Sequence, residues 1–169
     1  MKSLITLIFL VFCSASFSQT KIIAKNSLAT SKYKGFYSFG TSVEKGKVGT
    51  IQVYSETDST ILFCIDLNRG APSYNMGFLY GRLKIIKDSG MFYFKDTNLE
   101  NGCKWSFKFS KYILKIKTLE NMDDCGFGGG VFADGIYKRI SSKTQNYFQD
   151  GEGRKFYFKK TKPEDYYKE

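Results

Sequence analysis

Apolar and polar residues alternate along most of this chain with a period of two. In the segment 103–109, for example, the odd positions are apolar and the even positions are lysine or serine. A strand with one face in a core and the other in water has this period, whereas a helix would need apolar residues every three to four positions. The sequence therefore predicts an all-β protein.

Ten strands follow from the pattern, separated by short segments rich in glycine, aspartate and serine. They are Tyr33–Phe39, Val48–Tyr54, Thr60–Leu67, Met76–Ile86, Met91–Lys95, Cys103–Phe109, Tyr112–Thr118, Val131–Arg139, Asn146–Gln149 and Arg154–Lys160. A sheet with one buried face leaves exposed edges unless it closes on itself or pairs with a second sheet. We predict a small antiparallel β-barrel, or a compact sandwich, of about 8–10 strands.

Two short segments, "YKGFYSF" at 33–39 and "ADGIYKR" at 133–139, share a Gly-x-Tyr pattern. Glycine inside a strand permits a tight bend. The repeat predicts that the two segments meet at a closing seam of the barrel.

The first residues have the organisation of a secretory signal peptide. Lys2 precedes an apolar run, Leu4–Phe12, and Ser16–Ser18 resembles a small-residue cleavage site. The apolar run is shorter than the about 20 residues that span a membrane. Lipid attachment at Cys13 is disfavoured because the bulky Phe12 precedes it. We predict cleavage after Ser18 and export to the periplasm or the exterior, with no membrane span.

The remaining 151 of the 169 residues suit one domain. Residues 19–32 are expected to lead into a barrel at 33–140. Residues 141–169 are expected to form a basic, aromatic hairpin and a frayed tail.

The chain is strongly basic, with 26 Lys and Arg against 16 Asp and Glu; loss of Lys2 with the signal peptide leaves a net charge of +9. This surplus favours anionic partners, although a solvated lysine-rich surface is the simpler alternative. The segments 104–112 and 154–160 interleave lysine with aromatics, as surfaces for single-stranded nucleic acid do. A half-buried sheet gives the same pattern, and an exported protein meets little nucleic acid, so we expect no such partner.

Three cysteines remain after the predicted cleavage. We predict a disulfide between Cys103 and Cys125, which lie at strand–loop junctions, and a buried, reduced Cys64 within an apolar strand. The bridge would close a loop of about 23 residues, worth about 3 kcal/mol in the chain-entropy model.

Cys125 opens a glycine-rich run, "CGFGGG". A phosphate-binding loop would need a different glycine spacing and a following helix, whereas a strand pattern follows here. The run is expected to form a sharp turn anchored by the disulfide, and the alternative is a turn that also presents Phe127 to a partner.

The absence of histidine excludes Ser-His-Asp and Cys-His catalysis and histidine metal sites. Paired carboxylates remain, with Asp66 and Asp134 as the main candidates and Asp123 and Asp124 beside them; a glycosidase needs two carboxylates about 5–9 Å apart. The segment 96–102 departs from a calcium-binding loop, because its glycine comes one place late. We predict no catalytic residue, no metal and no cofactor.

The segment Asp66–Gly77 is the loop with the most site-like composition. Arginine, tyrosine and asparagine are common in binding surfaces. We predict that the partner contacts this loop and the glycine-rich turn; an ordinary hairpin connection is the alternative. The predicted binding residues are Asn68, Arg69, Tyr74, Asn75 and Phe127.

The resulting hypothesis is a non-enzymatic binding module of the bacterial cell envelope, which binds a protein or an anionic glycan through loops at one end of a barrel. The general form is similar to small exported β-barrel inhibitors and carriers of bacterial envelopes, including lysozyme inhibitors. The likeness is one of architecture, and it assigns no residue a function. An immunity-type envelope protein and a glycoside hydrolase that uses Asp66 with Asp134 are the alternatives.

Overall fold

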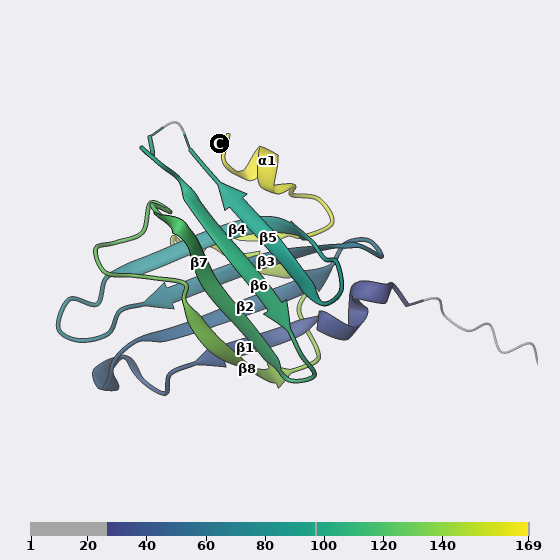
Figure 1. Ribbon diagram of the computed structural model, residues 1–169, viewed down its shortest axis with the longest axis horizontal. Helices are drawn as coiled ribbons and strands as arrows, with labels where there is room; N and C mark the ends of the chain where they lie inside the picture. The colour runs from purple at the N-terminus through teal and green to yellow at the C-terminus, as the bar shows by residue number, and fades with distance from the viewer. Residues whose placement is uncertain (1–26, 97, 169) are drawn as a thin grey trace, which may run out of the picture.

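The computed structural model describes residues 27–96 and 98–168, so the predicted signal peptide lies outside it (Figure 1). The protein is all-β, with short helical segments η1 (Ala29–Tyr33), η2 (Val43–Lys45) and α1 (Pro163–Tyr166). The strands are β1 (Gly35–Phe39), β2 (Val48–Ser55), β3 (Thr60–Asn68), β4 (Met76–Lys84), β5 (Ser89–Phe94), β6 (Cys103–Phe109), β7 (Ile113–Asp123), β8 (Gly135–Ser141), β9 (Tyr147–Gln149) and β10 (Lys155–Tyr157).

Eight strands form one antiparallel sheet in the order β4-β3-β2-β1-β8-β7-β6-β5. The sheet curls until its two edge strands, β4 and β5, approach each other, and an isolated bridge joins Ile86, in the turn after β4, to Ser89 at the start of β5. The predicted barrel is therefore confirmed as a nearly closed one.

The two Gly-x-Tyr segments do meet, because β1 pairs with β8. Each tyrosine donates its hydroxyl hydrogen to the carbonyl four residues earlier: Tyr37 to Tyr33 over 2.7 Å, and Tyr137 to Ala133 over 2.8 Å. A buried tyrosine bonded in this way fixes how the chain enters its strand. The sequence repeat is thus a structural repeat, although the open seam lies between β4 and β5.

The barrel interior is filled by large side chains. The inward positions of all eight strands form one apolar cluster, whose largest fully buried members include Trp105, Tyr37, Tyr137, Phe63 and Phe107. An eight-stranded barrel is just wide enough for its own side chains. The interior is a packed core, so any binding surface has to be sought on the outside or at the ends.

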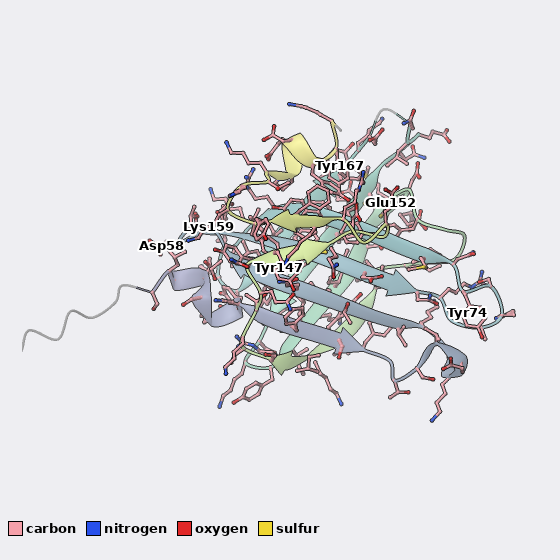
Figure 2. The ribbon with its side chains drawn as sticks, turned by 180° about the vertical axis from the view of Figure 1, so that it is seen from behind. Asp58, Tyr74, Tyr147, Glu152, Lys159 and Tyr167 are labelled. Carbon is pink, nitrogen blue, oxygen red and sulfur yellow. The ribbon has the colours of Figure 1, made fainter. Side chains whose placement is uncertain are left out.

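The C-terminal segment covers part of the outside. The β9–β10 hairpin and α1 pack on the outer face of β2–β4 in a second apolar cluster, formed by Leu62, Cys64, Tyr80, Phe148 and Phe158. Figure 2 shows this segment on the side opposite to β5, β6 and β7, which face the viewer in Figure 1. The outer face of β5–β8 carries no such cover.

The last residues, expected to fray, contain α1 and a contact with the open seam. The Tyr167 hydroxyl accepts a hydrogen bond from the Tyr80 backbone N–H (2.9 Å) and donates one to the Tyr80 carbonyl (2.8 Å). Its ring lies 4.7 Å from that of Phe94 in β5. One side chain thus satisfies backbone groups of edge strand β4 and contacts the other edge, which protects an otherwise unpaired strand.

Several strand boundaries differ from the prediction, most of all the end of β7, which runs on to Asp123, and the start of β8. Residues 131–134 are not part of β8, which begins at Gly135. The Val131 N–H bonds to the Gly128 carbonyl in a turn, and Val131 and Ala133 are buried in the core. These loop residues alternate in burial as a strand would, and this explains the error.

Candidate binding surfaces

Four connections lie together at one end of the barrel, at the left in Figure 1. They are the segments 40–47, 69–75, 98–102 and 124–134, which follow β1, β3, β5 and β7. The two loops predicted to bind a partner are among them. We call this end the loop end.

The two predicted binding loops are bonded to each other. The Arg69 guanidinium and the Asn75 side-chain amide both donate to the Gly129 carbonyl, over 3.1 and 2.7 Å. The Gly128 N–H in turn donates to the Met76 carbonyl over 3.0 Å. Arg69 and Asn75 therefore fix the shape of the loop end, each through a side-chain hydrogen bond to the same carbonyl.

Phe127 has a packing role. Its half-buried ring lies 6.0 Å from the Trp105 ring and packs on the main core cluster. It also lies directly over Gly77, where an added Cβ would come 2.6 Å from the Phe127 Cγ atom. Phe127 therefore closes the loop end of the core.

The two remaining predicted residues differ in exposure. The Asn68 side chain accepts a 2.7 Å hydrogen bond from the Gly70 N–H and so shapes its own loop. Tyr74 is 47% exposed and points away from the barrel at the tip of the loop, as labelled in Figure 2. Of the five predicted residues, Arg69 and Tyr74 are exposed to solvent, and their roles in binding stay predictions.

The glycines of the run shape the backbone, but not all of them do so through a positive φ. Only Gly126 and Gly130 have positive φ, of 73° and 75°. Gly128 is required by close approach instead, since a Cβ there would lie 2.9 Å from the Cβ of Asn75. Strand β8 follows the run, and no helix, so the structure has no helix N-terminus for a phosphate at this position.

The candidate catalytic carboxylates are far apart. Asp66 lies on β3 and Asp134 directly precedes β8, with β2 and β1 between them, which places them about 14 Å apart or more along the sheet. Asp134 accepts hydrogen bonds from the backbone N–H (3.1 Å) and the hydroxyl of Thr118. Partial burial raises the pKa of Asp66. Asp66 and Asp134 therefore do not form the carboxylate pair that the hydrolase hypothesis requires.

Asp66 and Asn68 instead contribute to a shallow groove on the outer face of β1–β3. It has a volume of about 400 Å³ and carries several hydroxyl groups beside one carboxylate and one amide. Its polar lining comes from Ser38, Thr41, Ser42, Thr50, Asp66 and Asn68. No lysine or arginine lines it, so it does not match the anionic partner that the net charge favours.

The three cysteines are buried and reduced in the structure, so the predicted disulfide is not confirmed. Cys103 and Cys125 are nevertheless neighbours in the main core. A hydrogen bond with the Cys103 thiol, together with burial, raises the pKa of the Cys125 thiol. Burial also raises the pKa of Cys64, which lies in the second cluster outside the barrel. Raised thiol pKa values disfavour the thiolate, and with it nucleophilic chemistry.

We expect the protein, under oxidising conditions, to contain a Cys103–Cys125 bridge and a free Cys64. Reduction of that bridge should lower the free energy of unfolding by about 2–5 kcal/mol. Peptide mapping under non-reducing conditions measures the connectivity. A link from Cys64 to either partner would contradict the structure, because Cys64 lies on the other side of the sheet from them.

A surface that the sequence did not single out lies on the outer face of β5–β8. The outward positions of β6, β7 and β8 carry Lys104, Lys108, Lys115, Lys117 and Lys138. The outward positions of the same strands and of β5 also carry exposed apolar side chains: Met91, Tyr93, Ile113, Ile136 and Ile140. We call these ten residues the lysine face.

The lysine face is poorly neutralised by the protein itself. Lys104 pairs with Glu120 over 2.6 Å, and the other four lysines form no ion pair within residues 27–96 and 98–168. Lys108 lies directly opposite Lys115 in the pairing of β6 with β7. Like charges in directly opposite positions destabilise a sheet. The arrangement therefore costs stability, as binding sites often do.

A sequence signal for this face exists. In β8 the residues Ile136, Lys138 and Ile140 share one parity, so apolar side chains occupy the water-facing side of the strand. The alternation in β6 and β7 indicates that their lysines face solvent. That β6, β7 and β8 lie side by side follows only from the strand order of the sheet.

Comparison with protein-family models, with curated proteins and with solved structures finds no match for this chain. Within the described residues, no helix has the length and apolar character to cross a membrane, and no cluster of acidic and sulfur ligands suits a metal ion.

Proposed function

We propose that this protein is an exported, non-enzymatic binding module of the bacterial cell envelope, which recognises an anionic partner through the lysine face. One observation carries the proposal: four lysines without an acidic partner among the described residues share one outer face, and two of them, Lys108 and Lys115, lie directly opposite each other. A bound polyanion would relieve this repulsion, and the positive potential would accelerate encounter with it.

The face replaces the loop end as the proposed interface. Arg69, Asn75 and Phe127 are engaged in holding the loops together. The lysines of the face, by contrast, project from rigid strands toward solvent. An anionic glycan or an acidic protein surface would complement them, whereas a basic lysozyme would be repelled.

Replacing Lys115 by glutamate separates binding from stability. The change places opposite charges directly across β6 and β7, and should raise the free energy of unfolding by about 0.2–1 kcal/mol. The same change should weaken binding of a soluble anionic polysaccharide, dextran sulfate, at least several-fold. Denaturant unfolding measures the first quantity, and interferometry on the immobilised polymer measures the second.

The matched control is Lys159→Glu, which makes the same charge change on the C-terminal segment, on the opposite side of the molecule (Figure 2). It should reduce polymer binding much less than Lys115→Glu does. Equal losses from the two variants would mean that only net charge matters, and the proposed interface would be wrong.

A further inference from the structure

We infer that the partner of the lysine face is the anionic phospholipid surface of a membrane, on which the barrel lies with β5–β8 against the headgroups. The inference rests on the proposed function, since it names the partner of the same face. Charge alone would fit any polyanion. The apolar side chains between the lysines distinguish a lipid surface from a soluble polymer.

Those apolar side chains are large and well exposed. Met91, Ile136 and Ile140 are 68%, 57% and 66% exposed. They alternate with lysines in space, since Ile136 lies opposite Lys115 and Ile113 opposite Lys138 in the pairing of β7 with β8. A soluble polyanion has charges but no apolar region for isoleucine to enter. A bilayer surface offers phosphates to the lysines and, a few ångströms deeper, acyl chains to the apolar residues.

A hollow at one edge of the face has the same dual character. It has a volume of about 550 Å³ and lies where β4 turns into β5. Lys84 and Lys108 line it together with Ile86 and Met91, and Ile86 is 63% exposed. The lysines would meet a headgroup phosphate while the two apolar side chains contact the glycerol and acyl carbons of the same lipid.

The cover on the barrel supports this orientation. The C-terminal segment buries the outer apolar cluster of β2–β4, so that side is sealed by the chain's own residues. The apolar side chains of β5–β8 are left exposed, and these strands lie on the side opposite to the C-terminal segment (Figures 1 and 2). A rigid sheet that is sealed on one side and both basic and apolar on the other suits peripheral binding.

The test is sedimentation of the purified exported protein with vesicles. One set is phosphatidylcholine alone and the other contains about one-third phosphatidylglycerol, which sets the negative surface potential. We expect binding to the anionic vesicles only, decreasing with added salt. Dextran sulfate serves as the soluble polyanion without an apolar region.

Three double variants locate the surface. Lys108→Glu/Lys115→Glu should weaken vesicle binding about 25-fold or more, since each lysine near an anionic surface contributes about a factor of five. Lys159→Glu/Lys162→Glu carries the same charge change on the C-terminal segment and should have a much smaller effect. Ile136→Ser/Ile140→Ser should weaken vesicle binding about tenfold or more and leave dextran sulfate binding unchanged.

The outcomes distinguish failure of the lipid inference from failure of the proposed function. Binding of dextran sulfate without binding of anionic vesicles would overturn the lipid inference and leave the proposed function standing. Vesicle binding that survives the isoleucine changes would also overturn it, because the apolar residues would then have no role. Binding of neither probe would overturn both proposals. Circular dichroism checks that each variant is folded, and the salt dependence of the unchanged protein tests the electrostatic part without any variant.

Discussion

Replacing Phe148 by alanine is expected to lower the free energy of unfolding by about 3–5 kcal/mol. Phe148 is fully buried at the centre of the outer cluster, with its ring centroid 4.3 Å from that of Tyr80 and 5.2 Å from that of Phe158. Its removal leaves a cavity between the C-terminal hairpin and the sheet. Tyr80, whose backbone is held by Tyr167, would lose a packing partner as well.

Denaturant unfolding, followed by the fluorescence of the single tryptophan, measures this loss. Trp105 lies inside the barrel and not in the outer cluster, so the signal reports whether the hairpin stabilises the barrel itself. Tyr157→Ala is the matched control, because Tyr157 is on the same hairpin but 41% exposed; it should cost less than about 1 kcal/mol. An unchanged midpoint for Phe148→Ala would mean that the hairpin does not stabilise the barrel.

The bounds of a strand are predicted correctly where its apolar residues are buried and its polar residues face solvent. The bounds of β6 were predicted without error because each odd residue enters the core and each even one faces solvent. The start of β8 was not, because Val131 and Ala133 enter the core from a loop. The contact of Tyr167 with β4 could not be predicted from the sequence. It joins residues 87 positions apart, and Tyr167 lies in a C-terminal segment whose sequence predicts a frayed tail.

The candidate site was harder to predict for a physical reason. Arginine and asparagine in a loop can donate hydrogen bonds to a partner or to a neighbouring loop of the same protein. Here Arg69 and Asn75 donate to the Gly129 carbonyl of the neighbouring loop. The lysine face depends on four strands lying side by side, of which β8 lies next to both β7 and β1. Each strand alone shows only an ordinary polar side.

Phe127 decides between the two interpretations of the glycine-rich run. Because its ring packs on the core and over Gly77, Phe127→Ala should lower the free energy of unfolding by about 3 kcal/mol. Binding of the anionic partner, measured below the unfolding transition, should be unchanged. Thermal unfolding and vesicle sedimentation on the same preparation give both quantities.

Tyr74→Ala provides the comparison at the other predicted loop, since Tyr74 is exposed and its side chain faces solvent. It should change the free energy of unfolding by less than about 0.5 kcal/mol. If Phe127→Ala instead leaves stability intact and abolishes binding, Phe127 is a partner anchor and the interface lies at the loop end. If Tyr74→Ala alone abolishes binding, the loop end again binds, through its exposed tip. Only a loss of stability from Phe127→Ala, with binding retained in both variants, leaves β5–β8 as the binding surface, since the loop end then acts as the closed end of the core.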